Sequence, residues 1–204
     1  DIGRNAGAND LIIAVRATDT TTAEAAVLGA IELLERPTAV NDDRTGWNPK
    51  SLNGALQALP EANLAIISVP GSFAAREARR ALRRGLNVMV FSDNVPIAEE
   101  RELKEDARAR GLMMMGPDCG TAIIGGTPLG FANAVPAGDI GIVSASGTGL
   151  QEVACLIARE GGGISHAIGV GGRDLSDTVG GITALAAIDA LDADPGTSRI
   201  VIIS

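Results

Sequence analysis

Aromatic residues, histidine and cysteine are scarce in this sequence. Among 204 residues, aromatics make up 2%, tyrosine is absent, and there are one histidine and two cysteines. Two cysteines provide neither a disulfide framework nor a metal quartet, so we expect reduced thiols in an intracellular, cytoplasmic protein. With so few aromatic side chains, the core must be built mainly from alanine, isoleucine, leucine and valine.

Positive charge is also in deficit. The sequence has 17 lysines and arginines against 25 aspartates and glutamates, which gives a formal net charge of -8. Because clustered lysine and arginine recruit phosphate backbones, this balance argues against a nucleic-acid partner. The sequence contains neither an apolar stretch of membrane-spanning length nor the pattern of a signal peptide at its first residues, so we expect no membrane partner.

Several catalytic motifs are missing as well. No Gly-Lys-Ser/Thr sequence occurs, which excludes a Walker-type phosphate loop. The turn at residues 144–149 does not match the G-x-S-x-G pattern of a hydrolase nucleophile, and the single histidine, His166, falls in an expected strand. Since no His, Cys or carboxylate cluster has ligand spacing, we predict no metal site and a structural role for His166.

Aliphatic residues and glycine are abundant, with 46% hydrophobic residues and 26 glycines. From Ser51 onward, apolar runs of strand length alternate with segments of helical periodicity, which is typical of a parallel, Rossmann-like sheet with right-handed crossovers. The expected strands are residues 64–69, 87–91, 112–115, 140–143, 164–170 and 200–203. The expected helices are residues 52–59, 72–84, 97–110, 149–159 and 182–191.

The beginning and the middle of the sequence have other patterns. We predict a buried strand at residues 11–16, a helix at 20–35 capped by Thr21 or Thr22, and a loop at 37–50. Residues 125–139 interrupt the alternation, so we place a Rossmann-like domain at 1–130 and a second α/β domain at 138–204. The final strand lacks a continuation, and we expect the sequence to be a fragment.

The stretch around residues 140–152 is the most informative part of the chain. An apolar strand turns through small residues into a helix, which leaves the first N–H groups of the helix without intrahelical partners. These groups, with the hydroxyls beside them, can bind a phosphate near the positive end of the helix dipole. The candidate phosphate ligands are Ser144, Ser146, Gly147 and Thr148. The alternative, that the hydroxyls only cap the helix, stays equally open.

A second glycine-rich loop follows the expected strand at residues 164–170. Gly171 and Gly172 allow the backbone to approach a ligand closely, and Arg173 can bind a carboxylate or phosphate through two N–H groups. The alternative is that Asp174 neutralises Arg173 in a surface ion pair of little energetic consequence. The position at the carboxyl end of a strand favours a ligand site.

Further turns with glycine or proline follow the first three expected strands, at residues 69–73, 92–96 and 116–120. In order, the segments Val69-Pro-Gly-Ser-Phe73, Gly116-Pro-Asp-Cys-Gly120, Gly141-Ile-Val-Ser-Ala-Ser-Gly-Thr148 and Gly169-Val-Gly-Gly172 resemble the α-subunit of succinyl-CoA synthetase and the wider NDP-forming acyl-CoA synthetase superfamily. Residues 87–95, 115–121, 126–133 and 166–176 resemble the FdrA proteins of that superfamily more closely. The resemblance extends from about residue 55 to the end.

This resemblance implies a Rossmann-like CoA-binding domain followed by a flavodoxin-like domain, incomplete here, with a phosphate site at a helix start. It implies coenzyme A, magnesium, a nucleotide (ATP or ADP) bound by a partner or a domain outside this sequence, and partner subunits or a homo-oligomer acting on a small-molecule acid. The residues that match the CoA-binding segments are Pro70, Gly71, Ser72, Phe73, Asn94, Pro96, Gly116, Pro117, Asp118 and Cys119.

Three departures from the superfamily pattern affect what activity we expect. Residues 16–21 replace the glycine-rich CoA phosphate loop, Asp118 replaces an asparagine, and the phosphorylated histidine would lie beyond Ser204, since His166 does not match it. The catalytic residue is therefore unknown, and we expect this piece alone to be inactive. FdrA proteins are linked with ureide catabolism, so the resemblance also allows a subunit of oxamate carbamoyltransferase that uses carbamoyl phosphate. A non-catalytic scaffold subunit is the third alternative.

Overall fold

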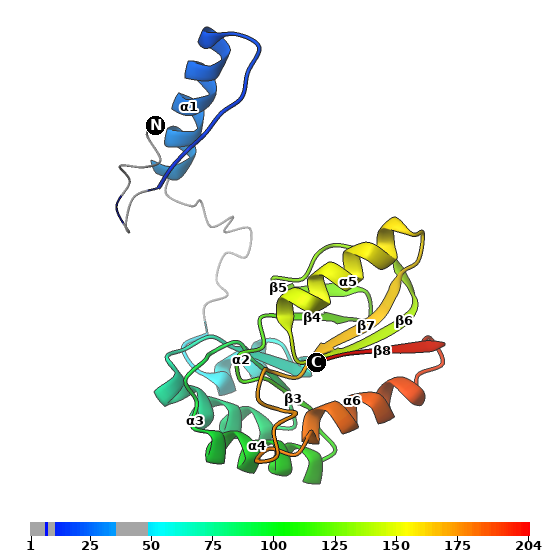
Figure 1. The fold of residues 1–204 in the computed structure, drawn as a ribbon. Coiled ribbons are helices and arrows are strands. Elements are labelled where there is room, and N and C mark those ends of the chain that lie inside the picture. The colour runs from blue at the N-terminus through cyan, green and yellow to red at the C-terminus, as the bar shows by residue number, and fades with distance from the viewer. Residues whose placement is uncertain (1–6, 8–10, 36–48) are drawn as a thin grey trace. The chain divides into compact units, whose positions relative to one another are not determined.

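The structure is a computed structural model that describes residue 7, residues 11–35 and residues 49–204. The chain forms two compact units, Asp1–Pro49 and Lys50–Ser204, which are described separately. In the first unit, α1 (Thr20–Glu35) confirms the predicted helix (Figure 1). Its first turn is capped by Asp19, whose carboxylate accepts hydrogen bonds from the N–H and the hydroxyl of Thr22, each at 2.8 Å. The prediction that Thr21 or Thr22 is the cap was wrong, because Thr22 acts as the donor.

The predicted buried strand at residues 11–16 was also wrong. These residues form no strand, and the side chains of Leu11 and Ile12 are 70% and 52% exposed. A strand needs a hydrogen-bonded neighbour. Within the described residues of the first unit, no second strand is present to provide one. The predicted loop at 37–50 lies almost entirely outside the described residues.

The second unit begins with a three-stranded parallel sheet in the order β1-β2-β3. Its strands are β1 (Leu64–Ile67), β2 (Asn87–Val90) and β3 (Met114–Met115). The accompanying helices are α2 (Leu52–Ala58), α3 (Gly71–Leu82) and α4 (Ile97–Ala109). α3 and α4 lie side by side (Figure 1). Alanines and leucines of both helices pack on Val88 and Val90, so small side chains bring the helices close to the sheet.

A second sheet has the order β5-β4-β7-β6-β8. Its strands in chain order are β4 (Thr121–Ile124), β5 (Thr127–Gly130), β6 (Ala137–Ser144), β7 (Ile164–Gly169) and β8 (Arg199–Ile203). β6 pairs in parallel with β7 and β8, whereas β4 is antiparallel to β5 and β7. The hairpin of β4 and β5 was not predicted, because both strands are short and flank the glycine turn Gly125-Gly126.

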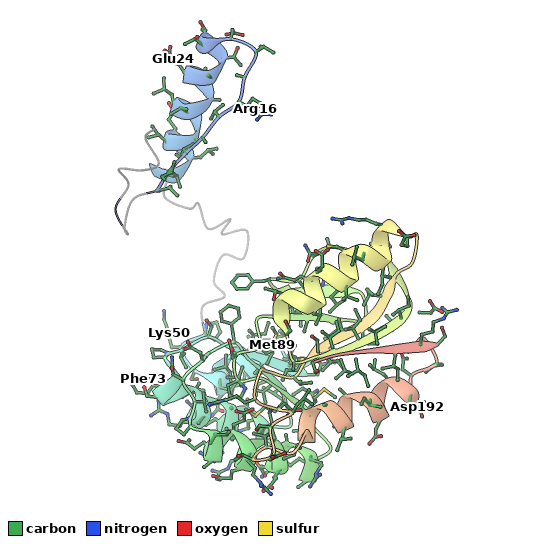
Figure 2. The ribbon with its side chains drawn as sticks, viewed as in Figure 1. Arg16, Glu24, Lys50, Phe73, Met89 and Asp192 are labelled. Atoms are coloured by element: carbon green, nitrogen blue, oxygen red, sulfur yellow. The ribbon has the colours of Figure 1, made fainter. Side chains whose placement is uncertain are left out.

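Helices α5 (Gly147–Arg159) and α6 (Ile182–Asp192) lie on opposite sides of the second sheet (Figure 1). Successive residues of a strand face opposite sides, so Ile142 packs with Leu150 of α5, whereas Val143 packs with Ala187 of α6. The cluster around Val143 also contains Met89 of β2, which joins the two sheets into one core. Figure 2 shows Met89 in the interior. No helix among the described residues is long and apolar enough to cross a membrane.

Candidate functional site

A cleft of about 970 Å³ lies at the carboxyl ends of strands from both sheets. This is the edge at which ligands bind in open α/β sheets. Of the predicted site residues, Asp118, Ser146, Gly147 and Thr148 line the cleft. The other lining residues are Ser68, Val69, Phe91, Ser92, Asp93, Gly120, Thr121, Phe131, Ala145 and Gln151.

The start of α5 forms one wall of this cleft and is only partly capped. The hydroxyl of Ser146 accepts a hydrogen bond from the N–H of Gly149 at 3.0 Å. Gly147 and Thr148 are exposed, and within the described part of the chain no protein group accepts a hydrogen bond from their N–H groups. The structure therefore shows the cap by Ser146 and leaves two N–H groups available to an anion, so the phosphate site stays a prediction.

Ser144 stabilises the backbone of this turn. It is buried, and its hydroxyl donates to the carbonyl of Ser146 at 2.7 Å and accepts from the N–H of Ser146 at 3.1 Å. The hydroxyls of Ser146 and Thr148 are 3.4 Å apart. Ser144 thus lies behind the cleft and fixes the backbone of the turn, while Thr148 lies at its surface.

The wall opposite comes from the ends of β2 and β3. The hydroxyl of Ser92 accepts a hydrogen bond from the N–H of Val69 at 3.1 Å, and its carbonyl accepts one from the N–H of Asp118 at 3.0 Å. Asp93 and Asp118 are exposed, and within the described ranges neither carboxylate has a hydrogen bond or an ion pair. Asp118 has φ 58°, a conformation that asparagine, aspartate and glycine tolerate better than other residues.

Two phenylalanines meet at the cleft, in a chain that has three in all. Phe91 and Phe131 make an edge-to-face contact with ring centroids 5.1 Å apart. Gln151 of α5 donates to the carbonyl of Phe131 at 2.7 Å, which ties the loop after β5 to this helix. Sequence reasoning did not single out Phe91, Phe131 or Gln151 as site residues. No sequence pattern singles them out, because their place at the cleft depends on contacts across the fold.

The predicted CoA-binding residues flank the cleft, and among them only Asp118 lines it. Pro70, Gly71, Ser72 and Phe73 begin α3, where a side chain on Gly71 would collide with the backbone oxygen of Asp93. Figure 2 shows Phe73 at the surface, and its ring lies under the guanidinium of Arg76 at 5.9 Å.

Asn94 and Pro96 lie just before α4, where Pro96 is its N-cap and Asn94 has φ 55°. Gly116 and Pro117 form a cis peptide bond behind Asp118, and Cys119 is buried. Burial raises the pKa of the Cys119 thiol to about 11. The thiol therefore stays protonated near neutral pH and is a poor nucleophile.

The second glycine loop does not line the cleft. Gly171 packs so closely on Pro117 that a side chain would collide with its backbone oxygen, whereas Gly172 is exposed with open space around its Cα. The guanidinium of Arg173 donates to the carbonyl of Val95 at 2.7 Å and lies 2.8 Å from a carboxylate oxygen of Glu100.

The surroundings of the Asp174 carboxylate differ from those that the sequence-based alternative gave it. The alternative of a surface ion pair between Asp174 and Arg173 is wrong, because Asp174 is fully buried and lies 2.6 Å from the ammonium of Lys104. Its carboxylate also accepts hydrogen bonds from the N–H groups of Thr183 and Ala184, at 3.2 and 2.9 Å. The start of α6 is therefore occupied by a protein carboxylate.

His166 lies away from the cleft. Its Nδ1 accepts a hydrogen bond from the N–H of Gly125 at 3.1 Å, and its Nε2 is 3.6 Å from a carboxylate oxygen of Asp194. The first contact holds the turn between β4 and β5, and the second connects β7 with the loop after α6. Among the residues that the structure describes, no group of three or more histidines, cysteines or carboxylates could hold a metal ion.

Comparison with known proteins finds similarity to subunits of CoA ligases. No family model matches the chain. It is 57% identical over 154 residues to the uncharacterized protein YahF of Escherichia coli K12, covering 76% of this chain and 30% of YahF. It is 30% identical over 148 residues to the α subunit of an ADP-forming succinate–CoA ligase from Methanothermobacter thermautotrophicus, covering 70% and 48% of the two chains. Subunit SauD of an ADP-forming sulfoacetate–CoA ligase from Bilophila wadsworthia is 29% identical over 149 residues, with 70% and 50% covered.

Among solved structures, ATP citrate lyase from Methanothrix soehngenii, determined with citrate and coenzyme A, matches with a TM-score of 0.66 and 24% identity. The match covers 75% of this chain and 26% of that protein. The chain spans about half the length of the curated ligase subunits it matches. These matches confirm the predicted α/β fold of the succinyl-CoA synthetase α-subunit type, and they identify α subunits of ADP-forming CoA ligases as homologues of this chain.

Proposed function

We propose that this chain is the CoA-binding and phosphate-binding part of an acyl-CoA ligase subunit of the FdrA type. The observation that carries the proposal is the start of α5, whose two free N–H groups face a cleft between the sheet ends. Homology to ligase subunits supports it. We further propose a CoA-binding domain and a ligase domain, with the β4–β5 hairpin belonging to the second because it pairs with that sheet.

In this proposal the phosphoryl group binds at α5. The N–H groups of Gly147 and Thr148 donate to its oxygens, and the hydroxyls of Ser146 and Thr148 lie beside them. Donors fixed in advance toward developing negative charge typically contribute about 3–4 kcal/mol each to transition-state stabilisation. Ser144 holds the turn in this geometry, so the chain needs no rearrangement to bind the anion.

Coenzyme A lies, in this proposal, along the predicted segments at 70–73, 94–96 and 116–119, and it supplies the thiol that accepts the acyl group. Gly71 and Gly116 are required by the packing of these segments, because a side chain on either would collide with the backbone oxygen of Asp93 or of Val90. Since Cys119 keeps its proton, it does not compete with the CoA thiol as a nucleophile. The nucleotide, with magnesium, is bound by a partner subunit or by another domain.

Calorimetric titration tests this proposal. The wild-type chain is expected to bind CoA saturably with a Kd below about 1 mM, and inorganic phosphate independently. The variants Ser146→Ala and Thr148→Ala are expected to weaken phosphate binding, whereas Thr178→Ala, outside the cleft, leaves it unchanged. A folded wild-type chain that gives no heat with millimolar CoA would contradict the ligase proposal.

A second candidate function, carbamoyl transfer as in oxamate carbamoyltransferase, is favoured by the charge pattern of the cleft. The described residues that line it include Asp93 and Asp118 but no lysine, arginine or histidine. Carbamoyl phosphate has one phosphate for the N–H groups of α5 and an amide that can donate to a carboxylate. Formation of carbamoyl phosphate from oxalurate and phosphate by the complete complex tests it, and an inactive complete complex would eliminate it.

A further inference from the structure

Four charged side chains form a buried cluster between α4 and the loop that leads to α6. Lys104 lies 2.9 Å from Glu100 and 2.6 Å from Asp174, and all three side chains are fully buried. Arg173, which is 43% exposed, lies 2.8 Å from the other oxygen of Glu100. The contacts of Glu100 are ion pairs without hydrogen-bond geometry. The two positive and two negative groups balance, which is the condition under which buried charges are tolerated.

One branch of this buried cluster, a series of hydrogen bonds, connects it with the start of α5. The ammonium of Lys104 donates to the carbonyl of Val170 at 3.0 Å, and the N–H of Val170 donates to the carbonyl of Ser144 at 2.8 Å. The hydroxyl of Ser144 in turn holds both backbone groups of Ser146. Three hydrogen-bonded steps therefore connect Lys104 with the N-cap of the phosphate-binding helix.

A second branch leads to the opposite wall of the cleft. Arg173 donates to the carbonyl of Val95, the residue between Asn94 and Pro96. Asp174 caps α6 through Thr183 and Ala184. The hydroxyl of Thr183 donates to the carbonyl of Met114, just ahead of the Gly116-Pro117 turn, at 2.8 Å. α4 and α6 lie next to each other at this point (Figure 1).

We infer that Lys104 and Asp174 are positioning residues that hold the turn at Ser144–Thr148 and the segment at 116–118 in one fixed arrangement. This inference rests on the proposed function for its ligands, phosphate and CoA. A well-packed apolar replacement of a buried ion pair often preserves stability, so the fold alone does not require these charges. Their hydrogen bonds to Val170, Thr183 and Ala184 give the pair a directional role that apolar side chains lack.

The double variant Lys104→Met/Asp174→Asn tests this inference, because it removes one charge of each sign and keeps similar volumes. The matched control is Arg110→Met/Asp106→Asn, which removes an exposed ion pair at 2.8 Å on the same helix. Three quantities are measured for each: the melting temperature, the affinities for inorganic phosphate and for CoA, and the rate of exchange of the hydrogen-bonded amides at residues 118–119 and 145–149.

The single variant Lys104→Met is expected to melt well below the wild type, and the double variant to recover most of that loss. We expect the double variant nevertheless to bind phosphate about tenfold more weakly or worse, with faster exchange at both segments, because small displacements of ligand groups have large effects. The control is expected to match the wild type. A stable double variant with wild-type affinity and exchange would overturn the inference.

The exchange measurement separates this inference from the proposed function. If the wild type binds neither phosphate nor CoA, the proposed function fails. Exchange of the amides at residues 118–119 and 145–149 still decides whether Lys104 and Asp174 position these segments, since it needs no ligand. Faster exchange only near α6 would show a purely local cap and would also overturn the inference.

Discussion

The starts of α5 and α6 differ in what meets their N–H groups, although only the start of α5 was predicted from the sequence as an anion site. Each follows a strand of the same sheet, α5 directly after Ala145 and Ser146 and α6 after a longer, glycine-containing loop. At α5, Ser146 satisfies one N–H group and two remain free beside the cleft. At α6, the buried carboxylate of Asp174 accepts from two N–H groups and also binds Lys104. A helix start binds a ligand only when the protein has not already supplied the anion.

The cap at the start of α1 is intermediate between those of α5 and α6. Its start is capped by Asp19, a carboxylate that is exposed to solvent and has no cationic partner among the described residues. The three helices thus start with a hydroxyl, an exposed carboxylate and a buried, ion-paired carboxylate. The difference predicts how much each cap contributes to stability.

The largest effect is expected for Asp174→Ala. This change leaves Lys104 with one carboxylate instead of two and removes the acceptor for Thr183 and Ala184, so the free energy of unfolding should fall by about 3–5 kcal/mol. Urea unfolding measures the loss, with Asp177→Ala, an exposed aspartate in the same connection, as the control. A loss below about 1 kcal/mol would show that the carboxylate at α6 is as dispensable as a surface group.

Ser146→Ala is expected to have a smaller effect on the free energy of unfolding, about 1 kcal/mol, which is typical for the loss of an N-cap. Water can reach the start of α5 and replace the lost acceptor, whereas it cannot reach the start of α6. The same urea experiment gives the ratio of the two effects. Equal losses for Ser146→Ala and Asp174→Ala would remove the distinction between an open and an occupied helix start.

Thr148→Asp should convert the open start into an occupied one. A carboxylate in the first turn of α5 interacts favourably with the helix dipole, so stability should rise by about 0.3–1 kcal/mol. The added charge should at the same time abolish phosphate binding in calorimetry. Thr148→Asn serves as the uncharged control of similar size. Unchanged phosphate affinity in the aspartate variant would mean that phosphate does not bind at α5.

The smallest effect concerns Asp19. The hydrogen bond from the N–H of Thr22, followed by that from its hydroxyl, lowers the pKa of Asp19 below its ordinary value of 3.8. A carboxyl group with a lowered pKa stabilises the folded state above that ordinary value, and this stabilisation is lost as the pH falls through the lowered pKa. Carboxyl titration by NMR should give a midpoint below 3.8, and a midpoint at or above that value would mean that Asp19 does not cap α1 in solution.

Local pattern was sufficient to predict most elements of the second unit. Strands and helices from Leu52 to Ile203 were predicted within a few residues, because apolar periodicity and glycine or proline boundaries specify them locally. The hairpin of β4 and β5 was missed, since four-residue strands beside Gly125-Gly126 produce too short a pattern. The strand expected at residues 11–16 failed for the opposite reason, because an apolar run does not ensure a pairing partner.

The candidate site was partly predictable. Residues 144–148 were predicted from the strand–turn–helix pattern, and Asp118 from the resemblance. Phe131 and Gln151 were not, because their roles depend on contacts with Phe91 and with each other across the fold. Glu100 and Lys104 have the spacing of an ordinary exposed helix pair, which gives no sign of burial.

The sequence by itself determined where strands end, where helices begin and which turns are free of bulky side chains, because these features depend on neighbouring residues. Only the tertiary structure decided which helix start stays open. Lys104 meets a carboxylate 70 residues further along the chain, and that pairing directs Asp174 into the start of α6. Among the residues that the structure describes, no comparable carboxylate reaches α5, so its N–H groups remain available to a ligand at the edge where the two sheets meet.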